Sequence, residues 1–211
     1  MDIGLVNSVS STSEVKSVKN TAYSQDNQQK VDYSSYSMSD LIKIPYEEAK
    51  ATNGQIKERK EELIQNGLSD EERKESAKLF VQTAAINYSA NDNFNKGFYE
   101  TLQNSDNPED AVIMSFEIKT NLSDYYYGKD VSASFVVSND EIHANKDLTK
   151  GQINSIDFND FVSTMLKNFK EDLNNASTAQ DSVKEQYKQI IDGYNSLQKN
   201  YDQEVRKPYY A

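Results

Sequence analysis

The amino-acid sequence predicts an α+β domain that is mainly α: a helical bundle with a small antiparallel β-hairpin, behind a disordered N-terminal arm. Three observations support this fold class. Two long segments carry apolar residues at helical spacing, two shorter segments alternate apolar and polar residues as strands do, and the polar first 40 residues keep no period. We therefore predict an arm over residues 1–40 and a single domain over residues 41–211.

The segment from Thr178 to Val205 predicts one long amphipathic helix. Its apolar residues recur at alternating steps of four and three, and charged or amide residues fill the positions between them. The apolar seam consists of Val183, Tyr187, Ile190, Tyr194, Leu197, Tyr201 and Val205. A lone helix cannot shield such a seam from water, so we expect the rest of the chain or another protein to cover it.

A second amphipathic helix is predicted from Asp157 to Leu173. Its apolar face comprises Phe158, Phe161, Val162, Met165, Leu166, Phe169 and Leu173. Burial of each large side chain contributes about 1.5–3 kcal/mol, so this face should supply the densest part of the core. The short link over residues 174–178 favours an antiparallel pair with the C-terminal helix.

Further helices are predicted in the first half of the domain. Pro45 lies near the start of one helix, which ends at Asn66-Gly67. Ser69 and Glu72 form a capping-box pattern at the start of the next. We expect its apolar face to be Ala77, Phe80, Val81, Ala84 and Tyr88, and its water-facing side to carry Arg73, Lys74, Glu75 and Lys78. A shorter helical piece is predicted from Phe94 to Leu102.

The period of the sequence changes after the turn at residues 106–108. Apolar residues alternate with others from Ala111 to Lys119, and again from Val131 to Val137, which predicts two strands. We expect them to form an antiparallel hairpin around a loop that contains Tyr125-Tyr126-Tyr127-Gly128. Because two strands alone are marginally stable in water, the hairpin should lie against the helices.

Composition narrows the class of partner. The chain has 34 acidic and 23 basic residues, a net charge of -11 at pH 7, and no cysteine. An acidic surface disfavours nucleic acids and anionic membranes, and the absence of thiols excludes disulfides and Cys-ligated metals. We therefore expect the partner to be another protein, neutral or basic where it makes contact.

The expected location follows from the apolar segments. No apolar run approaches the length of a membrane span, so we predict no membrane insertion. The segment Met1–Val6 lacks both the positive n-region and the continuous apolar h-region of a Sec signal. We predict a cytoplasmic protein, or one secreted without a Sec signal peptide.

No sequence pattern fixes a catalytic chemistry. The only histidine, His143, lies in a polar segment without the glycines of a nucleophile elbow, so we interpret it as an exposed loop residue. Dinucleotide, P-loop and zincin motifs are absent, and residues 145–157 fail the ligand spacing of a calcium loop. We predict no catalytic residue, metal site or cofactor. The alternative hypothesis is a small hydrolase that uses carboxylate and tyrosine side chains in a cleft beside the hairpin.

Tyrosines are the candidate partner-binding residues in this sequence. The candidates are Tyr125, Tyr126, Tyr127, Tyr187, Tyr194 and Tyr201. The first three occupy a predicted loop, where large aromatic side chains can anchor a partner; alternatively, they continue the hairpin and pack on the core. The last three share the C-terminal seam, which is either core or a protein–protein contact. As a contact, this helix could also join two copies of the chain.

The N-terminal sequence resembles that of exported bacterial proteins. Residues Met1 to Ser13 are similar to the Ser-rich export signals of flagellar and other type III secretion substrates. An unfolded arm, a helical bundle and antiparallel strands together resemble a flagellar export co-chaperone. The resemblance covers the first twenty residues and the general architecture, and it assigns no functional residue. It implies an export-associated protein of bacterial type. Independently of the resemblance, the missing catalytic motifs, the long C-terminal seam and the disordered arm predict a non-enzymatic protein-interaction protein.

Overall fold

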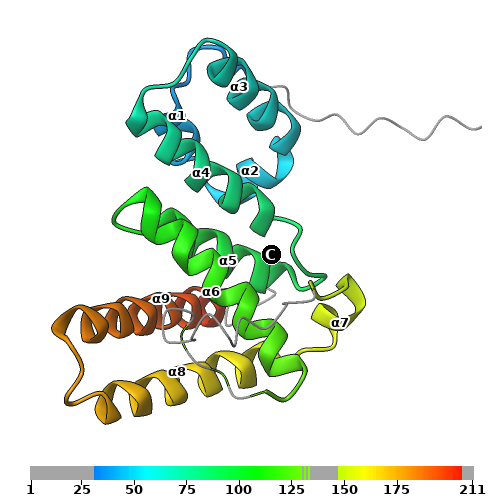
Figure 1. The fold of residues 1–211 in the computed structure, drawn as a ribbon. Helices are drawn as coiled ribbons and strands as arrows, with labels where there is room; N and C mark the ends of the chain where they lie inside the picture. Colours follow the sequence, from blue (N-terminus) through cyan, green and yellow to red (C-terminus); the bar gives the residue numbers. More distant parts are fainter. Residues whose placement is uncertain (1–30, 130, 132, 134–146, 206–211) are drawn as a thin grey trace, which may run out of the picture.

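The computed structural model of the chain describes residues 31–129, 131, 133 and 147–205, and every regular element among them is an α-helix (Figure 1). The helices are α1 (Met38–Leu41), α2 (Tyr46–Ala51), α3 (Asn53–Gln65), α4 (Asp70–Ala85), α5 (Asp92–Gln103), α6 (Pro108–Tyr126), α7 (Lys150–Asn154), α8 (Phe158–Asn175) and α9 (Asp181–Val205). The predicted α+β class is therefore wrong for the described residues, which form an all-α fold.

Helix α6 replaces the first strand of the predicted hairpin. Asn107 caps it, since its Oδ1 accepts a hydrogen bond from the Asp110 backbone N–H at 2.9 Å. Pro108 stands at the first helical position, and two acidic residues occupy the first turn. These are all signals of a helix start, and they outweigh the alternation of the residues that follow.

The second predicted strand, residues 131–137, lies outside the described residues except at positions 131 and 133. Neither of these two belongs to a helix or a strand. No β-hairpin is therefore present in the part of the chain that the structure describes. His143 also lies outside that part.

Helices α8 and α9 form the predicted antiparallel pair, and α5 packs on the other side of α9 (Figure 1). Tyr194 of α9 lies in the centre of this core, with ring centroids 6.0 Å from Phe161 and 5.6 Å from Phe169. The expected apolar face of α8 is buried from Phe158 to Phe169. Both C-terminal helices and their packing are thus confirmed.

Side-chain hydrogen bonds join the link between α1 and α2 to α4 and α5. The Gln82 side-chain amide donates to the Ile42 carbonyl at 3.2 Å, and the Tyr99 hydroxyl donates to the Ile44 carbonyl at 2.8 Å. Tyr33 and Met38, which we assigned to the arm, are buried in this part of the core. The helix expected from Pro45 to residue 66 is interrupted at Thr52, where α2 ends and α3 begins.

Helix α4 begins with the predicted capping box, but its buried face differs from the predicted one. Ser69 and Glu72 exchange the expected hydrogen bonds. Phe80 is 60% exposed, whereas Lys78 is buried and its Nζ donates to the Ser105 carbonyl at 3.1 Å. The reason is tertiary: α4 packs against α1, α5 and α6, and those neighbours decide which side is covered.

Candidate functional site

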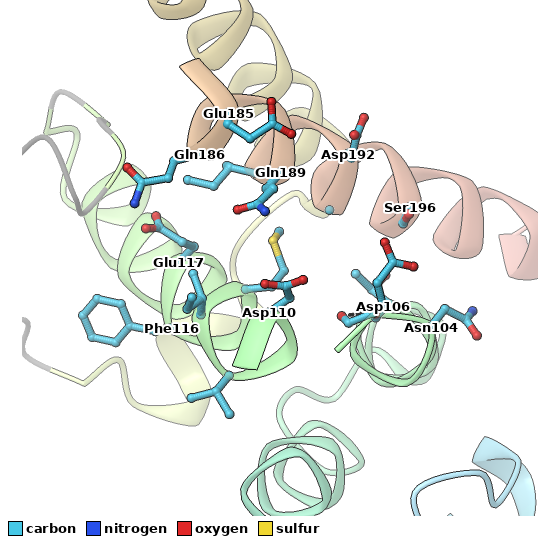
Figure 2. Close-up of a pocket in the computed structure, with 17 residues that line it drawn as sticks. Asn104, Asp106, Asp110, Phe116, Glu117, Glu185, Gln186, Gln189, Asp192 and Ser196 are labelled. Carbon is cyan, nitrogen blue, oxygen red and sulfur yellow. Dashed lines mark hydrogen bonds between the residues drawn. The ribbon is translucent and has the colours of Figure 1, made fainter. Parts of the chain in front are cut away.

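A groove with a volume of about 810 Å³ lies between α6 and α9. Figure 2 shows the side chains of α6 on one side, those of α9 on the other, and Asn104 and Asp106 of the α5–α6 turn at one end. The groove therefore combines three segments, two of them more than 50 residues apart in the sequence.

The α6 wall carries a strip of exposed apolar side chains. Val112, Ile113 and Phe116 are 36%, 54% and 55% exposed. These positions lie within one turn of each other along the helix, so they form one continuous strip. On the side of α6 that faces the core, Met114 and Ile118 are buried, and Met114 also lines the groove where α6 meets α9. We name the three exposed residues the α6 strip.

Acidic side chains line the same groove as the α6 strip. The carboxylates that line the groove belong to Asp106, Asp110, Glu117, Glu185 and Asp192. None of the described lining residues is Lys, Arg or His. Two of these carboxylates have basic neighbours outside the lining: Lys188 Nζ lies 3.4 Å from Glu185 Oε2 in an exposed ion pair, and Lys78 interacts electrostatically with Asp106. A concave surface lined by one sign of charge concentrates the field, so this groove should attract cations and basic side chains.

Contacts between α6 and α9 fix the walls of the groove. Gly193 of α9 faces Met114 of α6, and a Cβ atom at that position would clash with the Met114 sulfur. The Asn121 side-chain amide donates to the Tyr194 hydroxyl at 2.9 Å within the core. The two helices therefore meet through a small residue and a buried hydrogen bond, and the groove opens beside this contact.

The three seam tyrosines are part of the core of this chain. Tyr187, Tyr194 and Tyr201 are all buried. Burial raises the pKa of Tyr194 well above its usual value, and the Tyr201 hydroxyl accepts a hydrogen bond from the Asn91 amide at 3.4 Å. Helices α5 and α8 cover the seam. Of the two alternatives for these tyrosines, core or protein–protein contact, their burial in this chain favours core.

The other three candidate tyrosines lie at the end of α6 and not in a hairpin loop. The Tyr125 hydroxyl donates to Asp160, and this hydrogen bond is the main reason that the pKa of Tyr125 rises to about 12. Tyr126 and Tyr127 are exposed and pack edge to face, with ring centroids 5.1 Å apart. None of the six candidate tyrosines lines the groove.

Sequence reasoning did not find the groove residues. The available signal was the excess of apolar residues on α6, because Met114 and Ile118 already supply a buried face and Val112, Ile113 and Phe116 lie outside it. Interpreted as a strand, these residues fill two faces of a sheet. A helix at this position buries only one face, so the apolar residues outside that face are exposed on the surface.

The described residues contain no group of three or more acidic, His or Cys side chains arranged to hold a metal ion. None of the described helices has the length and apolarity that crossing a membrane requires.

The sequence matches no family model, and no curated protein or solved structure matches the chain. The groove itself is therefore the basis for assigning a function.

Proposed function

We propose that the chain is a non-enzymatic protein-interaction protein, and that it binds another protein in the groove between α6 and α9. The observation that carries this proposal is the α6 strip, an apolar surface on the wall of an acidic groove. Contiguous exposed apolar side chains rimmed by polar ones are typical of protein contact sites. Because Phe116 is 55% exposed, covering the rest of its ring would contribute about half of a full side-chain burial, or about 1–1.5 kcal/mol.

Binding is favoured over the hydrolase hypothesis for a chemical reason. That hypothesis placed its carboxylates in a cleft beside a hairpin, and the described residues contain no hairpin. In the groove, the hydroxyls of Thr101, Ser105 and Ser196 have no His or Lys among the described lining residues to act as a base. The carboxylates line the groove together with apolar side chains, which suits recognition of a surface better than bond cleavage.

The test is capture of a partner from a lysate of the native organism by the full-length chain, read by quantitative mass spectrometry. We expect a stoichiometric partner that the Ile113→Ser/Phe116→Ser double variant loses. The matched control is Phe80→Ser, which removes an equally exposed ring on α4, outside the groove. Because all three side chains are exposed, both variants should keep the wild-type circular dichroism and melting temperature.

Two results would contradict the proposed function. One is a partner that the groove double variant retains in full. The other is equal loss of the partner in the Phe80→Ser control. Either result would place the contact elsewhere on the chain.

We also propose a link to flagellar or type III export, which rests on residues 1–20 and lies outside the described residues. The test is a fusion of residues 1–40 to a reporter in cells with a working export apparatus. The proposal expects the reporter in the medium. Retention of the reporter inside the cells would overturn the link and leave the groove proposal unaffected.

A further inference from the structure

We infer that the segment bound in the groove is an amphipathic helix with basic residues along its edges. This inference rests on the proposed function and names the chemistry of the partner.

The dimensions of the groove suit a helix of about three turns. Lining residues on α9 run from Glu185 to Ser196. At a rise of 1.5 Å per residue, this wall is about 16 Å long. A helix laid along the groove, beside the contact of Gly193 with Met114, would place side chains at i, i+3, i+4 and i+7 against the α6 strip, as in other complexes that bind a helix in a groove.

The charges of the groove determine which kind of helix it accepts. All five ionisable side chains that line it are carboxylates, and the whole chain carries a net charge of -11. An acidic segment, or the same face of a second copy, would therefore place like charges together. A helix with Lys or Arg beside its apolar face would pair with these acids.

The distance between two of the carboxylates predicts the spacing of the basic residues on the partner helix. Glu185 and Asp192 lie seven residues apart on α9, which is two helical turns or about 10 Å. Both are labelled on the α9 side of the groove in Figure 2. A partner helix packed alongside α9 would meet them with basic residues at positions i and i+7.

The test uses synthetic peptides of about five helical turns and the full-length chain, with binding read by fluorescence anisotropy at low ionic strength. The first peptide carries leucines on one face and lysines at the edges of that face. The second has the same composition in scrambled order, so that it has no apolar face. The third replaces each lysine with glutamate. We expect the first to bind at least about tenfold more tightly than the other two, since each 1.4 kcal/mol changes the dissociation constant tenfold.

Variants of the chain locate the peptide. Ile113→Ser/Phe116→Ser should weaken binding of the first peptide by at least about tenfold, because apolar anchors dominate such contacts. Glu185→Gln/Asp192→Asn should weaken it by about threefold to tenfold, the range for two partly exposed charge pairs. The charge-matched control is Glu58→Gln/Glu61→Gln on α3, which contributes no residue to the groove and lies apart from α6 and α9 in Figure 1. This control and Phe80→Ser should leave the affinity unchanged.

Equal binding of the ordered and scrambled basic peptides would overturn the inference, because it would indicate attraction to bulk charge alone. Unchanged affinity in both groove variants would overturn it as well. If no peptide binds while the groove double variant still loses its partner from the lysate, the proposed function stands and the basic helix is wrong. If the lysate partner is also independent of the groove, both proposals fail.

Discussion

At the scale of single residues, two glycines set how closely α9 approaches its neighbours. A Cβ atom at Gly97 of α5 would lie 3.1 Å from the Tyr201 backbone nitrogen, and one at Gly193 would meet Met114. Glycine inside a helix costs about 1 kcal/mol relative to alanine, so each position needs a reason. The structure supplies that reason, because the helices touch at both places.

We predict opposite effects for two Gly→Ala substitutions. Gly97→Ala should destabilise the chain by about 1–3 kcal/mol, because the backbone of α9 must move to accept the methyl group. Gly54→Ala in α3 should instead stabilise it by about 0.5–1 kcal/mol, since no heavy atom lies within 4 Å of the added Cβ. Urea unfolding monitored by circular dichroism measures both. Equal effects would contradict the close packing of α5 on α9.

Buried tyrosines predict a loss of stability at alkaline pH. Burial raises the pKa of Tyr88 to about 12 and that of Tyr194 well above its ordinary value near 10. Below about pH 10 both folded and unfolded states keep these protons. Above it the unfolded state releases them first, so the free energy of unfolding should fall from about pH 10 to pH 12 and beyond.

Ultraviolet absorbance of tyrosinate, followed together with circular dichroism, measures this dependence. Tyr88 and Tyr194 should ionise only well above pH 10, as the helices unfold. Ionisation of all 14 tyrosines near pH 10 with the helical signal intact would contradict the burial of the seam.

At the scale of elements, the secondary-structure type could be predicted from the sequence where a helix has a single apolar face. Helices α8 and α9 each bury one apolar face, and their periodicity gave the correct type and most of the core residues. Leu173 and Val183 are half-buried, and the side chain of Val205 lies outside the described part of the chain. Helix α6 has apolar residues on several sides, so its local alternation resembled a strand. The cap at Asn107-Pro108 carried the correct information, but we interpreted it as a turn.

The assignment of α6 as a helix predicts the effect of removing its cap. Asn107→Ala should lower the free energy of unfolding by about 0.5–2 kcal/mol, because the Asp110 N–H loses its acceptor. Asn195→Ala, at an exposed position inside α9, is the matched control and should be neutral or slightly stabilising. Chemical denaturation compares the two. No difference between them would argue for a strand or turn at this position.

At the scale of the whole molecule, the helical character of the domain was predictable and the site was not. The groove forms where three segments meet in space: the α5–α6 turn, α6 and α9. Its lining residues include Asp106 and Ser196, which lie far apart in the sequence. Sequence periodicity reports which residues of one element share a face, and it does not report which elements become neighbours. We predicted the tyrosines as candidate partner-binding residues because large aromatic side chains are common in protein contacts. Tyr194, however, is completely buried in the core.

The central claim is that another protein contacts the exposed side of α6 beside α9. Photo-crosslinking tests it most directly, with a photoreactive phenylalanine analogue placed at Ile113 in one full-length variant and at Phe80 in another. Both positions are more than half exposed, but only Ile113 lines the groove. We predict a discrete crosslinked partner from position 113 and none from position 80 in the native organism. A partner captured at position 80 alone, or at neither position, would contradict the account.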